Sequence, residues 1–283
     1  MEGMFSVIYW DPKPEIFRLP LLDWPILWYG AFFALGFVVG FPLLVSLLTR
    51  FFGQKRSEAV KITDRLTFYM ILGTLIGARL GHFLFYERPS HYLNDPLGIF
   101  RTWEGGLASH GGAVGILLAL ALFAGRLRKS APELTWVRLL DLVAIPAAFA
   151  GFCIRIGNFI NQEILGTPTD LPWGVIFGHP ADRSPSVPLH PVQIYEALFY
   201  LSLFACLWRF SSFLLKKPGR VIGLFLVAVF GFRFCIEFLK LEQSYLLSSS
   251  HLTMGQILSI PLFIGGLFFL FYPRIPYFQK HLT

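Results

Sequence analysis

Seven apolar runs, most of them about twenty residues long, limit what this chain can fold into. They occupy residues 26–48, 66–86, 105–124, 139–155, 191–210, 221–240 and 254–272. A helix needs about 20 apolar residues to cross a bilayer core, and lipid leaves the backbone only helices or closed barrels as spanning structures. The runs therefore predict an all-α integral membrane protein, a bundle of about seven transmembrane helices.

The composition supports this prediction. Of the 283 residues only 14% are charged, whereas soluble domains carry about a quarter, and the mean hydropathy is +0.60. No linker or internal repeat separates the runs, so we expect a single polytopic membrane domain over residues 1–283. The first run follows Asp11, Glu15 and Asp23 instead of a basic segment, so we expect it to be retained as a helix and not cleaved.

Lysine and arginine alternate between the connecting segments. They are dense after the first, third and fifth runs, at Arg50, Lys55, Arg56, Lys61, Arg65, Arg126, Arg128, Lys129, Arg138, Lys216, Lys217 and Arg220. The other segments have few. The positive-inside rule then predicts an external N-terminus and a cytoplasmic C-terminus. Most of the net charge of +7 is therefore explained by membrane orientation, and it gives little support to nucleic-acid binding. The three cysteines, Cys153, Cys206 and Cys235, are expected to be buried small hydrophobes.

The segment Arg155–Gly166 is the strongest site candidate, because it places an arginine, two asparagines and a glutamate directly after the apolar run 139–154. Polar groups at a membrane helix mouth must be hydrated, paired or bound to a polar ligand. Further ionisable groups lie within or beside the runs and, by the predicted orientation, near the outer surface: Arg79, His110, His190, Arg233 and Glu237. Such groups tend to mark function.

Several of these residues have a plain structural alternative. Arg233 and Glu237 are four residues apart and could neutralise each other on one helix face. His110 could be an interfacial histidine or a base, and Tyr29 an aromatic-belt residue. In the motif from His190 to Glu196, a helix start with hydrogen-bonding side chains is the favoured interpretation of Gln193 and Glu196. Glycines 73, 77 and 81 predict a face for close helix packing.

The ordered motifs resemble those of the bacterial prolipoprotein diacylglyceryl transferase family. They are Trp28-Tyr29-Gly30, Gly77 to Gly81, Gly105-Gly106 with His110-Gly111-Gly112, Arg155 to Gly166, His190 to Glu196, and Phe232-Arg233 with Glu237-Phe238. The chain departs from the family pattern at Ile154 and Gln162, where glycine is common, at Ala108-Ser109, and after Glu237-Phe238. The arginines, His110, Asn158 and Glu163 are in place.

The resemblance implies transfer of the diacylglyceryl group from phosphatidylglycerol to the lipobox cysteine thiol of a prolipoprotein, with glycerol-1-phosphate released. It implies catalytic roles for His110 as proton acceptor and for Arg155 and Arg233 as ligands of the phosphate and leaving oxygen. Substrate-binding roles fall on Tyr29, Arg79, Asn158, Asn161, Glu163, Gly166, His190 and Glu237. No metal or other cofactor is expected, and no zinc spacing or phosphate loop is visible.

The same resemblance implies a location in the bacterial cytoplasmic (inner) membrane. With the predicted orientation, the site would face the outer leaflet. Both substrates are embedded in the membrane, so we expect them to enter laterally from the bilayer. The connection 167–189 is expected to be an external loop, either a substrate-facing flap or a plain connection. Two other function classes remain open. A transporter or ion-coupled carrier would use the same charges but should show polar groups near the midplane and repeated halves, and a membrane scaffold would make the charges structural.

Overall fold

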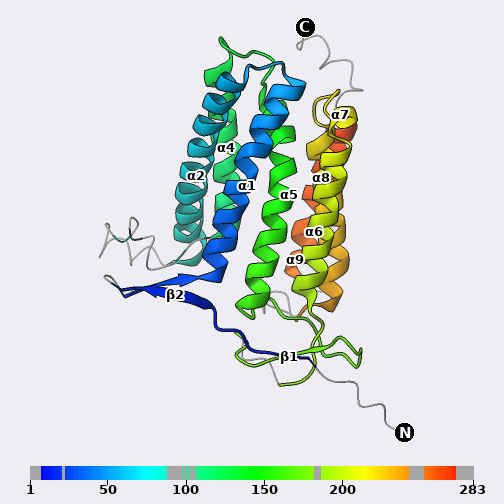
Figure 1. The fold of residues 1–283 in the computed structure, drawn as a ribbon. Coiled ribbons are helices and arrows are strands. Elements are labelled where there is room, and N and C mark those ends of the chain that lie inside the picture. The colour runs from blue at the N-terminus through cyan, green and yellow to red at the C-terminus, as the bar shows by residue number, and fades with distance from the viewer. Residues whose placement is uncertain are drawn as a thin grey trace. The chain divides into compact units, whose positions relative to one another are not determined.

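The computed structural model describes residues 8–20, 23–87, 98, 101, 106, 108–181, 186–241 and 252–271. Its long helices are α1 (Trp28–Phe51), α2 (Arg56–Tyr86), α4 (Ser109–Leu127), α5 (Trp136–Ile160), α6 (Val192–Arg209), α8 (Arg220–Ile236) and α9 (Met254–Phe271). Two short helical segments, α7 (Ser211–Leu214) and the 3-10 turn η3 (Glu237–Leu239), extend α6 and α8. Figure 1 shows these helices. The predicted all-α architecture is confirmed.

Six helices of the described part are long and apolar enough to cross a membrane, namely all the long helices except α6. The membrane assignment is therefore confirmed, whereas the predicted orientation stays a prediction. Helix α6 coincides with the predicted fifth run and is 18 residues long. Gly105 and Leu107 of the predicted third run lie outside the described residues.

Helix ends differ from the predicted runs in two places that matter for the site. Helix α2 begins at Arg56, ten residues before the predicted start, because a helix can begin in charged residues that precede the apolar run. Helix α5 continues to Ile160, so Arg155 and Asn158 lie in its last turns and not beyond it. The start of the candidate motif is thus held by helical geometry.

The chain divides into two compact units, the first comprising residues 1–40 and 143–283 and the second residues 41–142. In the second unit α2 packs against α4. A Cβ added to Gly73 would lie 2.6 Å from the carbonyl oxygen of Gly115, and one added to Gly81 would lie 2.7 Å from the Cα of Gly111. The small residues therefore allow close helix contact, as the glycine spacing predicts.

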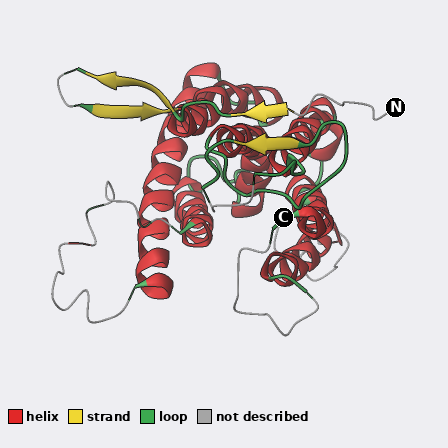
Figure 2. Ribbon diagram, turned by 90° about the horizontal axis from the view of Figure 1, so that it is seen from below, coloured by secondary structure: helices red, strands yellow, loops and turns green. Residues whose placement is uncertain are grey.

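In the first unit α8 packs against α9 and α6. Two small sheets accompany the helices (Figure 2): β1 (Ile8–Trp10) pairs in parallel with β4 (Val175–Phe177), and β2 (Glu15–Leu19) pairs in antiparallel with β3 (Trp24–Leu27). No pattern in the sequence predicts these short strands. Leu165, Val175, Phe177 and Leu189 form a buried apolar cluster, against which Trp10 and Phe159 pack. This cluster anchors the connection 167–189 beside the end of α5.

Candidate active site

Helix α5 ends in a Schellman motif, in which two backbone amides beyond the last turn bond back into the helix. Glu163 N donates to Asn158 O at 2.9 Å, and Gln162 N donates to Phe159 O at 3.3 Å. Gln162 occupies the left-handed position of this motif, with φ +54°. Glycine adopts this conformation without steric cost, which explains why a glycine is common there in the resembled family.

The Gln162 side chain forms hydrogen bonds that a glycine could not make. It is 2% exposed, its Nε2 donates to Asp11 Oδ1 at 3.2 Å, and its Oε1 accepts from His179 N at 2.7 Å. Asp11 Oδ1 also lies 2.5 Å from Nδ1 of His179. The hydrogen bond from His179, with a smaller contribution from Gln162, lowers the pKa of Asp11 below its ordinary value of 3.8. Gln162 thus ties the helix end to Asp11, directly after β1, and to the 167–189 connection.

Four side chains of the motif form one hydrogen-bonded chain. Arg155 Nη1 donates to Asn158 Oδ1 at 3.1 Å, and Asn158 Nδ2 donates to Glu163 Oε2 at 2.9 Å. Asn161 Nδ2 donates to the other carboxylate oxygen of Glu163 at 3.1 Å. Asn158 is only 3% exposed. Since α5 and its cap fix all four backbones, the motif presents a preorganised polar surface and not four independent side chains.

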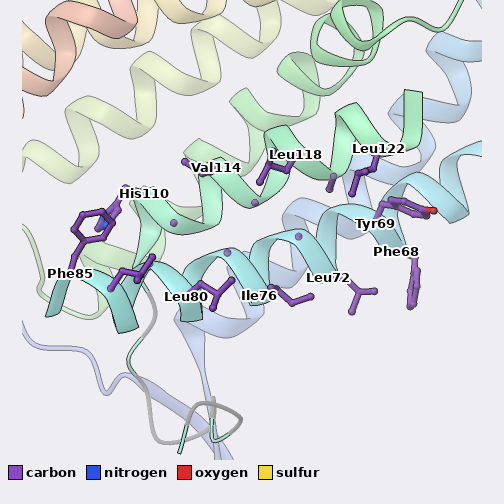
Figure 3. A pocket seen from close by; sticks show the side chains of 17 residues that line it. Phe68, Tyr69, Leu72, Ile76, Leu80, Phe85, His110, Val114, Leu118 and Leu122 are labelled. Carbon is purple, nitrogen blue, oxygen red and sulfur yellow. The ribbon is translucent and has the colours of Figure 1, made fainter. Parts of the chain in front are cut away.

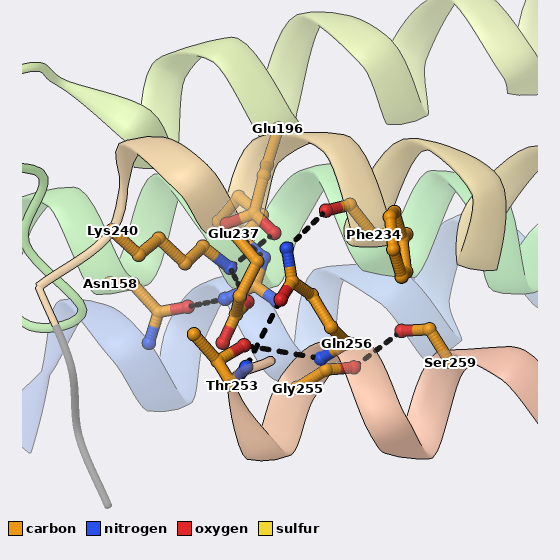
Figure 4. A network of polar contacts seen from close by, with 10 residues as sticks. Asn158, Glu196, Phe234, Glu237, Lys240, Thr253, Gly255, Gln256 and Ser259 are labelled. Atoms are coloured by element: carbon orange, nitrogen blue, oxygen red, sulfur yellow. Dashed lines mark hydrogen bonds and ion pairs between the residues drawn. The ribbon is translucent and has the colours of Figure 1, made fainter. Parts of the chain in front are cut away.

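A second polar group meets Arg155 from α6 and from the end of α8. Glu196 Oε2 forms an ion pair with Arg155 Nε at 3.2 Å, and Glu196 Oε1 accepts a hydrogen bond from Lys240 Nζ at 2.9 Å. Lys240 Nζ also lies 3.7 Å from Glu237 Oε2. Glu196, Glu237 and Lys240 point toward one another in Figure 4. Alternating charges therefore compensate one another at a site where unpaired charges would be costly.

Backbone pairing holds this cluster against the motif. Thr167 N donates to Leu239 O at 2.8 Å, and Leu241 N donates to Leu165 O at 3.0 Å. Gln193 Nε2 donates to the backbone oxygen of Glu163 at 2.7 Å. The exit of α8 and the start of α6 are thereby fixed to the segment that follows α5.

Helix α9 closes the cluster from another side (Figure 4). Its first turn is a capping box: Gln256 N donates to Thr253 Oγ1, and Thr253 N donates to Gln256 Oε1. Gln256 Nε2 also donates to Phe234 O of α8 at 3.4 Å. A Cβ on Gly255 would collide with the carboxylate of Glu237, so the glycine provides the space which that carboxylate occupies.

Arg233 differs from Arg155 in its surroundings. Within the described part of the chain its guanidinium forms no ion pair or side-chain hydrogen bond. The possible pairing of Arg233 with Glu237 is wrong for this structure, because η3 begins at Glu237 and brings its carboxylate to Lys240 instead. Arg155 and Arg233 both act electrostatically on the hydroxyl of Tyr200, a buried residue of α6. The two arginines thus approach the same side chain.

Tyr29, Gly166 and His190 lie in the first unit, like Arg155. The ring of Tyr29 packs on Gly157, where an added Cβ would lie 2.9 Å from Tyr29 Cδ2, and its hydroxyl is in electrostatic range of Arg155 and Glu163. A Cβ on Gly166 would lie 2.7 Å from the Cβ of His190, so Gly166 permits close chain packing. His190 Nδ1 lies 3.3 Å from the Tyr195 hydroxyl.

Arg79 and His110 belong to the second unit. Arg79 Nη1 donates to Gly106 O at 3.2 Å, and Arg79 Nη2 donates to Gly98 O. His110 is exposed at the start of α4, with its ring 5.3 Å from the ring of Phe85. It lies at one end of a largely apolar groove of about 640 Å³ along α2 and α4 (Figure 3).

The first unit thus brings together most of the residues that the sequence singled out, including Tyr29, Arg155, Asn158, Asn161, Glu163 and Glu237. The sequence alone does not identify Lys240, Gln193 and Glu196 as partners of the motif. Glu196 carried a detectable signal, since a carboxylate inside an apolar run requires a partner. The cysteines also differ from expectation: Cys153 is buried, but Cys206 and Cys235 are exposed on α6 and α8, where apolar surroundings in a membrane would come from lipid.

Comparison with known proteins agrees with this picture. The family described as Prolipoprotein diacylglyceryl transferase matches residues 14–272. Proteins named phosphatidylglycerol–prolipoprotein diacylglyceryl transferase are similar to nearly the whole chain: that of Chloroherpeton thalassium is 41% identical, with 94% of both chains covered. That of Tolumonas auensis is 40% identical over 92% of this chain and 95% of its own. That of Protochlamydia amoebophila is 34% identical over 94% and 95%. The chain belongs to the prolipoprotein diacylglyceryl transferase family.

Proposed function

We propose that this protein transfers the diacylglyceryl group of phosphatidylglycerol to the lipobox cysteine of prolipoproteins, the first step of bacterial lipoprotein maturation. The observation that carries the proposal is full-length similarity to relatives named for this reaction. The arginine-bearing polar cluster supports it, because the reaction needs cationic groups that hold a phosphate.

The reaction forms one bond and breaks one. The cysteine sulfur, as thiolate, attacks the glyceryl carbon that bears the phosphate, so a C–S bond forms while the C–O bond to phosphate breaks. The bonding electrons leave with glycerol-1-phosphate, and the thiol proton passes to a base. The thiolate is the reactive form of cysteine, and the leaving phosphate gains negative charge that positive groups can stabilise. We assign the base to His110 and the charge stabilisation to Arg155 and Arg233.

The two arginines suit different parts of this task. Arg155 is engaged with Asn158 and Glu196, so its guanidinium is oriented before substrate binds. Arg233 has no ion pair within the described part of the chain, and its donors can take the phosphate oxygens directly. A forked guanidinium gives two parallel hydrogen bonds to such oxygens. Arg233 is therefore assigned to direct phosphate binding, and Arg155 to a fixed contact with the leaving group.

The remaining site residues support the headgroup and the peptide. Asn158, Asn161 and Glu163 present the polar surface around Arg155, and Tyr29 borders it. Gly166, His190, Glu237 and Arg79 complete the substrate-binding assignments. Both substrates are embedded in the bilayer, so we assign the site to the outer leaflet of the bacterial inner membrane with lateral entry. The transporter alternative has no support from the relatives' names, and no cofactor is required by the proposed chemistry.

The direct test is transfer of labelled diacylglycerol from phosphatidylglycerol to a lipobox peptide by the purified protein in detergent. A peptide with alanine in place of the lipobox cysteine is the matched substrate control. Arg155→Ala should abolish transfer without unfolding the protein, whereas Arg126→Ala, at a site where the arginine is exposed and bonds Tyr69, should not. Absence of transfer by the wild-type protein with ample lipid would refute the proposed function.

A further inference from the structure

We propose that Glu196 is a positioning residue that sets the orientation of Arg155, and that Lys240 holds Glu196 in place for this purpose. The inference rests on the proposed function, since it assigns a task to residues behind the phosphate-binding arginine. Neither Glu196 nor Lys240 is assigned to the substrate. Both lie behind the motif, with side chains only 3% and 6% exposed.

The carboxylate of Glu196 divides its two oxygens between two cations. Oε1 accepts from Lys240 Nζ at 2.9 Å, and Oε2 pairs with Arg155 Nε at 3.2 Å. Because one oxygen is fixed by the lysine, the carboxylate cannot rotate freely about its terminal bond. The second oxygen therefore faces Arg155 from a defined direction.

Arg155 is held at two of its three guanidinium nitrogens. Glu196 pairs with Nε, and Asn158 accepts from Nη1 at 3.1 Å. A guanidinium is planar, so partners at two of its nitrogens restrict the orientation of the plane and the position of the third nitrogen. If Glu196 loses its charge, Arg155 keeps only contacts with neutral side chains, Asn158 and Tyr200, and can tilt away from the leaving oxygen.

Lys240 is itself fixed from several sides. Its ammonium lies between Glu196 and Glu237, and its backbone pairs with Gly166 in an isolated bridge. Its amide donates to Glu237 O at 3.2 Å. Without Lys240, the carboxylates of Glu196 and Glu237 would lose the cation that they share. Lys240 thus links the end of α8 to the orientation of an arginine on α5.

A purely structural ion pair predicts a different outcome from a positioning pair. When one partner of a buried pair is removed, the other is left uncompensated, whereas removal of both is often neutral for stability. The double variant Glu196→Gln/Lys240→Met should therefore regain the thermal midpoint that Glu196→Gln loses. If the pair only stabilises the fold, the double variant should also regain activity; if Glu196 orients Arg155, it should not.

The experiment measures kcat, KM for phosphatidylglycerol and the thermal midpoint in detergent for Glu196→Gln, the double variant and Lys240→Arg. We expect kcat to fall about 10- to 100-fold for Glu196→Gln and for the double variant, as a small misplacement of a catalytic group can do. KM should stay within about threefold, because ground-state binding is not the main loss. Lys240→Arg should remain close to wild type, and so should Glu58→Gln, which removes an exposed carboxylate paired with Lys61.

Two results would overturn the inference: an unchanged kcat for Glu196→Gln, or a double variant with wild-type kcat. Failure of the proposed function looks different, since the wild-type protein would then show no transfer at all. A second readout is independent of transfer. Phenylglyoxal modification of Arg155, followed by mass spectrometry, should be faster in Glu196→Gln than in wild type, and equal rates would contradict the positioning role.

Discussion

Replacement of Gln162 separates the cost of its backbone conformation from the value of its side-chain bonds. Gln162→Ala keeps a side chain in the left-handed conformation at φ +54° but loses the hydrogen bonds to Asp11 and His179. A neutral hydrogen bond contributes about 0.5–1.5 kcal/mol and one to a charged group about 1.5–3 kcal/mol. Since this side chain is buried but its partners are partly exposed, we expect the free energy of unfolding to fall by about 2 kcal/mol.

Gln162→Gly loses the same two hydrogen bonds but removes the conformational cost. The left-handed conformation costs a residue with a Cβ roughly 1–2 kcal/mol, and the greater freedom of glycine in the unfolded chain offsets about 0.4–1 kcal/mol of this gain. The glycine variant should therefore be about 1 kcal/mol more stable than the alanine variant and still less stable than wild type. For a protein of this size, each kcal/mol corresponds to roughly 2–4 °C in the unfolding midpoint.

Thermal unfolding of the three proteins in one detergent tests this order, which is wild type, then glycine, then alanine. Asp11→Asn in the Gln162→Ala background measures the contact of Asp11 with His179 separately, because the bond between Asp11 and Gln162 is already gone. An alanine variant as stable as wild type would refute the value given to the side-chain bonds. A glycine variant no better than the alanine variant would refute the conformational cost.

Three further predictions concern other parts of the molecule. Gly77→Ala places a Cβ against the backbone of α4 and should lower stability by about 1–3 kcal/mol, whereas Gly125→Ala, with open space around it, should not; unfolding midpoints compare the two. Because the pKa of Asp11 is lowered by His179, its stabilising contribution is complete above its ordinary pKa of 3.8 and is lost as the pH falls through the lowered value; acid unfolding of Asp11→Asn should lack this component. Arg233→Lys should reduce transfer about 10- to 100-fold, because an ammonium cannot form the forked pair of hydrogen bonds; near-normal transfer would remove Arg233 from direct phosphate binding.

The helices were predictable because their physical cause is local. Runs of about twenty apolar residues determine a spanning helix, and the structure has helices at all seven predicted places. The three-residue strands β1 and β4 carry no such pattern, and their pairing depends on segments far apart in sequence. Their existence could not be inferred from either segment alone.

The same distinction applies to the site. Arg155, Asn158 and Glu163 lie within one helix end, so their spacing alone predicts that they meet. The contact of Glu196 with Lys240 joins residues 44 positions apart, and no local pattern indicates it. Gln162 departs from the family pattern, but its partner Asp11 is 151 residues away. Long-range partners of polar residues are therefore what the sequence left undetermined.

The pairing of β1 with β4 also bears on how the protein is made. Asp11 and His179 are 168 residues apart, and translation at about 5–20 residues per second separates their synthesis by on the order of ten to thirty seconds. During that interval the N-terminal strand has no partner, because a parallel pair needs the intervening chain to return first. The contacts of Asp11 with Gln162 and His179 at the end of α5 therefore form late in biogenesis. They are complete only after the ribosome has passed the whole Arg155–Gly166 segment.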